Sequence, residues 1–165
     1  MSFAGLLEEF VADIGWKDEI ETLEDEALSR LAVRLKVGAG SFRLLLEGYE
    51  AQQWLVLSLY APFPARQETL VDLCLLFNYL NATFSYPGHI CAEDEAVCYR
   101  HIVDAGASGS GFGFIYNMLG AATDLFERHA AVIEAVAAGE AGYEDARMMI
   151  ERGSQSRGLS EEETH

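Results

Sequence analysis

Three consecutive segments of alternating side chains constrain the fold of this chain most. Between residues 31 and 37 every second residue is aliphatic, a pattern typical of a strand with one buried face. The segments 42–49 and 53–60 predict two further strands. The turns between them, at 38–41 and at Ala51-Gln52, are too short for a crossover connection. The sequence therefore predicts an antiparallel meander of three strands.

Helical periodicity appears on both sides of this meander. Apolar residues recur every three or four positions over 3–14, 66–81 and 112–138, and more weakly over 143–152. Ser2 is a suitable N-cap for the first helix, and Gly15 is expected to end it. We expect Lys17–Glu26 to be a loop, with a short turn possible, and Pro62 and Pro64 to stop the third strand.

A second group of strands follows the helix at 66–81. Residues 89–93 and 96–103 flank Asp94-Glu95 and predict a hairpin, and Thr83–Tyr86 could add a short strand. The resulting order is α-βββ-α-ββ(β)-α, which favours an α+β fold with an antiparallel sheet. We expect one domain over residues 1–140, then a weak helix and a disordered acidic tail over 141–165.

The charge balance excludes several function classes. The 165 residues include 27 acidic and 11 Lys or Arg side chains, a net charge of −16. Such a surface repels nucleic acid and anionic membranes. No apolar run reaches the roughly 20 residues of a membrane-spanning helix, and no basic segment near Met1 indicates a signal peptide. Three cysteines, an odd number, fit a reducing cytoplasm.

The predicted hairpin carries the most tempting metal ligands. His89, Cys91, Cys98 and His101 lie within 13 residues. With Asp94-Glu95 as a two-residue turn, Cys91 faces Cys98, but His89 faces Arg100 and His101 points to the other side of the sheet. We therefore expect two reduced thiols in a half-buried strand pair, with a metal site or an oxidised pair as the alternatives.

Catalytic and cofactor motifs are weak in this sequence. The stretch 105–113, AGASGSGFG, resembles a phosphate-binding loop, but it lacks the Gly-Lys-Ser/Thr ending and no lysine follows Lys36. We expect it to be a flexible turn. No Gly-x-Ser-x-Gly elbow accompanies the four histidines. The sequence thus predicts a protein that is not an enzyme and needs no cofactor.

Two of the predicted elements carry apolar side chains on more than one face, which indicates a surface for a partner. The helix at 66–81 carries a second apolar stripe, and the third strand is apolar on both faces. Seven residues form the predicted partner-binding or dimer surface: Trp54, Val56, Tyr60, Val71, Leu75, Leu76 and Tyr79.

The stretch LVDLCLLFNYLNATFSYPGHICAEDEAVCYRHIVDAG, followed by GFIYNMLGAATDLFERHAAVIEAV, resembles the type III secretion chaperone-like superfamily, which includes the YbjN-domain proteins of bacteria. A leucine-rich central helix with an asparagine near its end, here Asn78, precedes a hairpin and a long last helix. The likeness spans residues 3–138. It departs from that group at 85–88, where Ser-Tyr-Pro-Gly replaces the usual glycines.

The resemblance implies a small, acidic, non-enzymatic cytoplasmic protein that forms a homodimer. In that group the chaperones bind extended segments of other proteins, and YbjN proteins look more like regulators. We therefore expect a chaperone-like or regulatory adaptor that binds a protein partner in extended form. The alternatives are a sensory regulator that binds a small molecule under the last helix, and a metal-binding protein that uses His89, Cys91 and Cys98.

Overall fold

The computed structural model describes residues 2–106 and 111–162. Four α-helices and six strands follow one another in the order α1 (Phe3–Ile14), β1 (Glu21–Leu23), β2 (Leu28–Val37), β3 (Gly40–Tyr49), β4 (Trp54–Pro64), α2 (Leu70–Thr83), β5 (His89–Glu93), β6 (Ala96–Asp104), α3 (Gly113–Ala138) and α4 (Tyr143–Glu162). Short 3₁₀ turns precede β2 and α2.

All six strands form one antiparallel sheet in the order β1-β2-β3-β4-β6-β5. The meander β2-β3-β4 and the β5-β6 hairpin are the elements that alternation predicted, and the α+β class with an antiparallel sheet is confirmed. The two groups join where β4 pairs with β6, from Trp54 opposite Asp104 to Tyr60 opposite Cys98. This pairing brings together strands that α2 and β5 separate in the chain.

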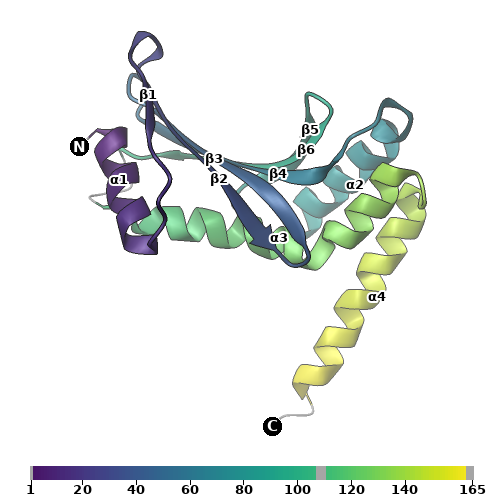
Figure 1. Cartoon of the computed structure of the whole chain (residues 1–165). Coiled ribbons are helices and arrows are strands. Elements are labelled where there is room, and N and C mark those ends of the chain that lie inside the picture. The colour runs from purple at the N-terminus through teal and green to yellow at the C-terminus, as the bar shows by residue number, and fades with distance from the viewer. Residues whose placement is uncertain (1, 107–110, 163–165) are drawn as a thin grey trace.

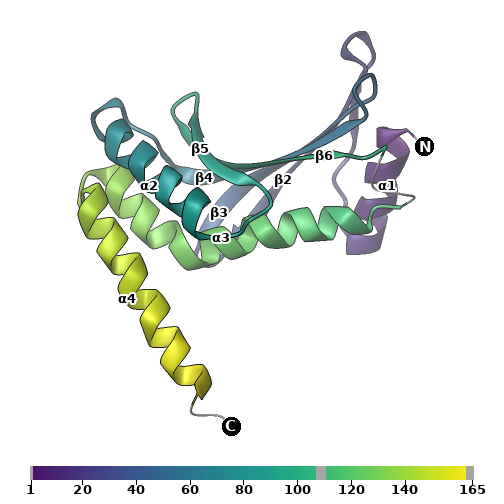
Figure 2. The same ribbon diagram turned by 180° about the vertical axis from the view of Figure 1, so that it is seen from behind.

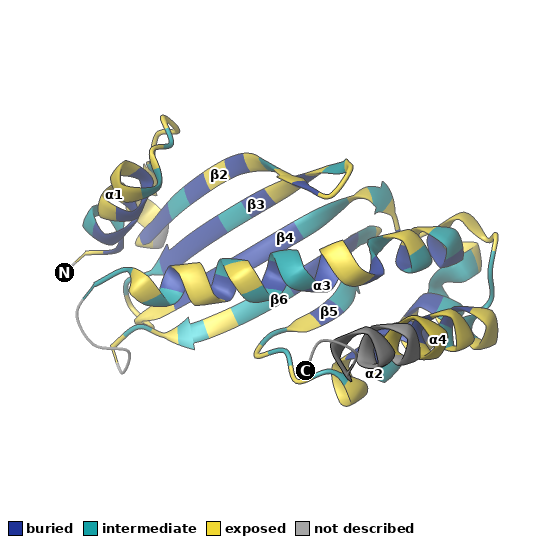
Figure 3. Cartoon of the chain, turned by 90° about the horizontal axis from the view of Figure 1, so that it is seen from below, coloured by how far each residue is buried: buried dark blue, intermediate teal, exposed yellow. Residues whose placement is uncertain are grey.

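The helices α1, α2 and α3 lie on one side of the sheet, and none of the described helices covers the other side (Figures 1 and 2). The long helix α3 crosses the covered side, α1 lies beside one of its ends and α2 beside the other (Figure 3). We call the uncovered side the open face. One sheet face thus contributes to the core, and no described helix covers the other.

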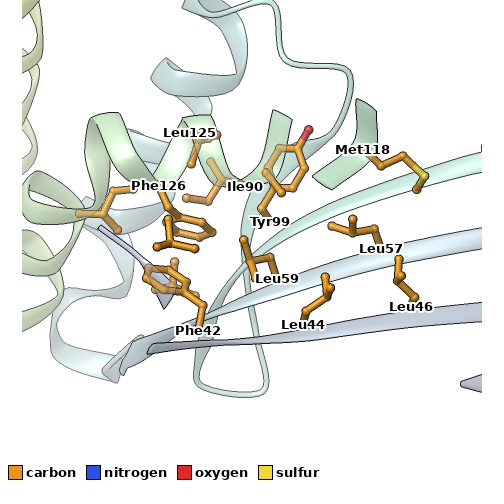
Figure 4. Packing of buried hydrophobic residues seen from close by; sticks show 14 of the residues in the cluster. Phe42, Leu44, Leu46, Leu57, Leu59, Ile90, Tyr99, Met118, Leu125 and Phe126 are labelled. Carbon is orange, nitrogen blue, oxygen red and sulfur yellow. The ribbon is translucent and has the colours of Figure 1, made fainter. Parts of the chain in front are cut away.

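The core fills the space between the covered face and α3. From β3, Phe42 reaches Phe126 of α3 with ring centroids 4.8 Å apart (Figure 4). Leu57 and Leu59 of β4 and Tyr99 of β6 are fully buried in the same cluster. Burial of a large apolar side chain contributes about 1.5–3 kcal/mol to folding, so this cluster stabilises the whole domain.

Helix α1 begins and ends where its sequence predicts. The Ser2 side chain accepts a hydrogen bond from the backbone N–H of Gly5. Gly15 adopts the left-handed conformation, with φ of 77°, that helix C-termini favour. The buried stripe of this helix packs on β2 and β3, where Gly48 leaves room for Phe3.

Three predicted boundaries are wrong. The segment Lys17–Glu26, expected to be a loop with a possible short turn, contains the strand β1, because Glu21–Leu23 pairs with the start of β2. Strand β4 continues through Pro62 to Pro64, since its register with β6 shifts between Tyr60 and Pro64 and a proline there costs no ladder bond. The possible strand at Thr83–Tyr86 is absent, because the last turn of α2 and a bend occupy it.

The C-terminal helix is longer than the sequence predicts. Helix α4 begins at Tyr143 and its backbone continues to Glu162, well past residue 152. Arg147 bridges to Glu144 and to Glu151 along the exposed side. Ala146 and Ile150 are buried in the main core cluster, so the first turns of α4 pack on the part of the chain before residue 140. The domain boundary at 140 stays a prediction.

Candidate functional site

The register of the sheet arranges the open face in transverse rows. One row runs across five strand positions: Arg34, Arg43, Tyr60, Cys98 and Cys91. A second row contains Ser58, Arg100 and His89, and a third contains Arg30, Glu47, Val56 and Ile102. Side chains of one row are near neighbours on the same face of the sheet.

A groove of about 300 Å³ opens on this face. We call it the sheet groove; its lining residues are Tyr49, Gln52, Trp54, Val56, Arg100 and Ile102. Trp54 and Ile102 are 47% and 49% exposed, whereas Val56 is buried at 6% and forms the floor. Two large apolar side chains at the rim of a recess on an uncovered sheet are typical of a contact site for another molecule.

The open face carries basic side chains among four acidic ones, Glu21, Glu47, Glu93 and Asp104, and is less acidic than the chain as a whole. It carries Arg30, Arg34, Lys36, Arg43 and Arg100, five of the 11 Lys and Arg residues. Two of them are paired: Arg30 with Glu47 at 2.8 Å and Arg100 with Glu93 at 2.9 Å.

The remaining exposed arginines face each other. Arg34 lies directly opposite Arg43 across β2 and β3, and the Arg43 guanidinium carbon lies 4.6 Å from the centroid of the Tyr60 ring. Like charges in opposite strand positions destabilise a sheet. The cation–π contact with Tyr60 offsets part of that repulsion. This corner of the face therefore suits a ligand group of negative charge.

Tyr60 links this corner to the β5-β6 hairpin. Its hydroxyl donates to Glu93 at 3.5 Å, and burial raises the pKa of Tyr60 above its ordinary value. Next to it Cys91 and Cys98 face each other, as the turn at Asp94-Glu95 predicted. The Cys91 thiol donates to the Cys98 carbonyl at 3.6 Å and the Cys98 thiol to the Tyr99 carbonyl at 3.4 Å. The neighbouring Cys98 side chain lowers the pKa of Cys91 to about 7. The pKa of Cys98 is raised by the same contact and by burial.

The seven predicted surface residues separate into three groups. Trp54, Val56 and Tyr60 lie on the open face, as alternation indicated. Val71 and Leu75, 73% and 46% exposed, and the half-buried Tyr79 lie on α2, on the covered side. The structure therefore does not bring the sheet residues and the helix residues together.

Leu76 does not belong to the predicted surface. Its side chain is fully buried in the core cluster, beside Leu73 and Leu80 of the same helix. Helix α2 contacts both β5 and α4, so a wider part of its circumference is covered than the sequence suggested. The exposed apolar strip of α2 is narrower than predicted.

Four groove residues are missing from the predicted surface: Tyr49, Gln52, Arg100 and Ile102. Alternation in β6 placed His101 with Val97 and Tyr99, which are buried, so the same signal assigns Ile102 to the open face. It could not show that Ile102 lies beside Val56, because that contact depends on the pairing of β6 with β4. The tertiary pairing, and not local pattern, creates the sheet groove.

The metal alternative receives no support from the geometry. Within residues 2–106 and 111–162, no three His, Cys, Asp or Glu side chains gather as a metal site would require. His89 faces Arg100, and His101 pairs with Leu57 toward the covered side. Residues 107–110 of the glycine-rich segment that resembles a phosphate-binding loop lie outside the described residues.

A second cavity lies between α3 and α4. It measures about 210 Å³ and is lined by Phe84, Arg128, His129, Val132, Met149, Ile150, Gly153 and Ser154. His129 is buried, and its ring lies 4.8 Å from that of Phe84. Aromatic and aliphatic walls with two basic side chains are consistent with a small organic ligand.

Comparisons with known proteins give a family and similar solved structures. The model of the YbjN family, described as "Putative bacterial sensory transduction regulator", matches residues 4–135. A crystal structure of the ExsC-ExsE complex has a similar fold, with a TM-score of 0.53 and 13% sequence identity, and the match covers 76% of this chain and 91% of that one. No curated protein matches.

In the part of the chain that the structure describes, no helix combines the length and the apolar character of a membrane span.

Proposed function

Since the chain belongs to the YbjN family, we propose that it is a regulatory adaptor that binds another protein and catalyses no reaction. The predicted YbjN resemblance and the type III secretion chaperone-like fold are both confirmed. The proposal places the protein in the cytoplasm, in line with its three free cysteines. The sheet groove is the observation that carries it.

The sheet groove supports a protein partner for two reasons. First, the large apolar side chain of Trp54 is half exposed at the rim of the groove. Tryptophan is enriched among the residues that contribute most binding energy in protein interfaces. Second, the groove is open along the sheet, so an extended or helical segment could lie across its rows. The ExsC-ExsE structure, a complex of two proteins on a similar fold, is consistent with this use.

The charge of the open face narrows the chemistry of the partner. Arg34 and Arg43 lie at one end of the face and the apolar groove rim at the other. A segment with apolar side chains followed by acidic ones would match both ends. We therefore propose an extended, acidic segment as the partner, whose affinity falls as ionic strength rises.

A double substitution tests the groove directly. Trp54→Ser with Ile102→Ser removes both rim side chains, and Met148→Ser with Met149→Ser on α4 removes two of similar exposure elsewhere. Proteins captured from cells by the wild type and by both variants are compared by quantitative mass spectrometry. A groove partner is recovered equally by wild type and α4 variant but falls about 30-fold with the groove variant, the effect of losing about 2 kcal/mol.

The purified partner must then show the same ranking in direct binding measurements. If the groove variant keeps every specific partner of the wild type at the same affinity, the sheet groove is not the binding site and the proposal fails.

We also propose that the adaptor is a homodimer formed through α2. Val71 and Leu75 lie one turn apart on its outer side, with the exposed Cys74 between them and the half-buried Tyr79 one turn further on. An exposed aliphatic strip on a helix is stabilised when a second copy covers it.

Sedimentation velocity at low micromolar concentration tests this dimer. The wild type and a Met149→Asp control on α4 should sediment as dimers, and Val71→Asp should sediment as a monomer, since a charge in an apolar interface costs more than the contact gains. A monomeric wild type, or a dimer that Val71→Asp leaves intact, would refute this part.

The α3–α4 cavity favours a second candidate, a regulator that senses a small molecule. Its volume of about 210 Å³ and its aromatic and aliphatic walls would suit a small organic molecule. A thermal-shift screen of metabolites separates the candidates: a ligand of this cavity raises Tm in the wild type but not in Val132→Trp, which fills the cavity. Substitutions in the sheet groove should leave that shift unchanged.

A further inference from the structure

The β5-β6 hairpin holds two thiols in a fixed arrangement on the open face. Asp94 and Glu95 both have positive φ, 48° and 62°, which is the turn geometry that sets a two-residue hairpin register. This register places Cys91 directly opposite Cys98. Cα atoms of opposite residues lie about 4.5–5.5 Å apart, inside the range of about 4.4–6.8 Å that a disulfide spans.

The two thiols differ in access and in protonation. Cys98 is fully buried, whereas Cys91 is half-buried at the edge strand and reachable from solvent. The neighbouring Cys98 side chain holds the pKa of Cys91 near 7, with a smaller contribution from the Arg100 guanidinium against the opposing effects of burial and Glu93. Cys91 is therefore the more readily ionised thiol of the pair, and Cys98 is the one that stays protonated.

Tyrosine and arginine side chains surround the two thiols. Tyr60 lies next to Cys98 in the same row, and Arg43 stacks on the Tyr60 ring. Arg100 stands two residues from Cys98 and bonds Glu93 at 2.9 Å. A partly exposed thiolate near arginines, with a second thiol in contact, is the arrangement in which thiols react with peroxide.

We propose that Cys91 and Cys98 form a peroxide-responsive dithiol site, with Cys91 as the attacking thiol and Cys98 as the resolving one. The Cys91 thiolate attacks one peroxide oxygen, the O–O bond breaks, and hydroxide leaves as a Cys91 sulfenic acid forms. The Cys98 sulfur then attacks the Cys91 sulfur; the S–O bond breaks and the OH group leaves as water with the Cys98 proton. One hydrogen peroxide is reduced and two thiols are oxidised to one disulfide.

The resulting bond should be reversible. Disulfides between facing residues of one strand pair must adapt to a backbone that is already paired, and strained or exposed disulfides are the ones that thiols reduce readily. The site therefore suits a reporter of oxidant level and not a permanent cross-link. This inference concerns the thiols alone and stands apart from the proposed partner.

The experiment uses the full chain with Cys74→Ser, because Cys74 is exposed on α2 and would react by itself. Hydrogen peroxide should convert this protein to a monomer lighter by two hydrogen atoms, with no free thiols, and dithiothreitol should restore both. Intact mass under non-reducing, denaturing conditions and a thiol count measure this.

Two further variants assign the roles. With Cys98→Ser added, dimedone should trap a sulfenic acid on Cys91; with Cys91→Ser added, the remaining thiol should react at least about tenfold more slowly. The proposal is overturned if the Cys74→Ser protein keeps both thiols in peroxide, if the disulfide joins two chains, or if the two single-thiol variants react at equal rates.

Discussion

The side chain of Asn81 makes two hydrogen bonds to the backbone of Ile90. Its amide nitrogen donates to the Ile90 carbonyl at 3.0 Å, and its carbonyl oxygen accepts from the Ile90 N–H at 2.9 Å. The last turns of α2 thus occupy the outward-facing backbone groups of the edge strand β5, which would otherwise be free to pair with another chain.

Removal of this contact should loosen the edge of the sheet. We expect Asn81→Ala to lower the free energy of unfolding by about 1–2 kcal/mol, because two backbone groups lose their partners. Urea denaturation followed by circular dichroism measures it. Asn78→Ala, on an exposed position of the same helix, should change stability by less than about 0.5 kcal/mol; equal effects of the two would contradict this role of Asn81.

Gly48 is required for the packing of α1 on the sheet. A Cβ atom at Gly48 would lie 2.3 Å from the Cβ and Cγ atoms of Phe3. We expect Gly48→Ala to destabilise the fold by about 1–3 kcal/mol. A matched substitution in α3, Gly120→Ala, meets no atom within 4 Å and should stabilise by about 0.5–1 kcal/mol, since alanine favours helix. Thermal unfolding of both variants gives the comparison, and a neutral Gly48→Ala would be inconsistent with the packing.

The repulsion between Arg34 and Arg43 should be visible in stability. Arg34→Glu converts the facing pair into opposite charges, so the free energy of unfolding should rise by about 0.2–1 kcal/mol. Because both groups are exposed, added salt should screen most of the gain. Urea titrations at low and high salt measure both effects. An Arg34→Glu protein less stable than wild type at low salt would show that the two arginines do not repel.

The hydrogen bond from Tyr86 to Asp124 should give an alkaline pH dependence. The Tyr86 hydroxyl donates to the Asp124 carboxylate at 2.9 Å, and burial together with this bond raises the pKa of Tyr86 to about 12. A raised pKa means that the contribution of Tyr86 to stability is fully present below about 10, the ordinary value, and is lost as pH rises toward 12.

Comparison with Tyr86→Phe isolates this contribution. At neutral pH the variant should be less stable than wild type by about 1 kcal/mol, and the difference should shrink as pH rises from about 10 to 12. Urea denaturation over that range measures it. A difference that stays constant with pH would exclude Tyr86 as its source.

Local patterns were sufficient wherever one short segment decides its own structure. The capping residues of α1, the register of the β5-β6 hairpin and the buried face of β3 all follow from residue type and spacing. The strand β1 could not be predicted, because Glu21–Leu23 is mostly exposed and exists by virtue of its pairing with β2. Asn78, the asparagine on which the family resemblance drew, is exposed, and Asn81 makes the structural contact.

The sequence predicts which single residues face the candidate site, but it does not predict which of them lie together. Alternation assigned Trp54, Val56 and Tyr60 to one face of β4. The groove also contains Ile102 and Arg100 of β6. These residues lie beside β4 because β6 pairs with it, although α2 and β5 separate the two strands in the sequence. Leu76 was assigned to the surface because helical spacing alone cannot tell that α4 narrows the exposed side of α2.

Because helices cover only one side of the sheet, residues needed for folding alternate along each strand with residues needed for recognition. In β3 and β4 every second residue is buried under α3, and the residues between them lie on the open face. A saturation mutagenesis of this protein should therefore yield two interleaved profiles. Cellular abundance should drop at Leu55, Leu57 and Leu59, whereas fitness without loss of abundance should drop at Trp54 and its neighbours on the open face. Tolerance would thus oscillate with a period of two residues, and the phase of that oscillation would distinguish folding from recognition.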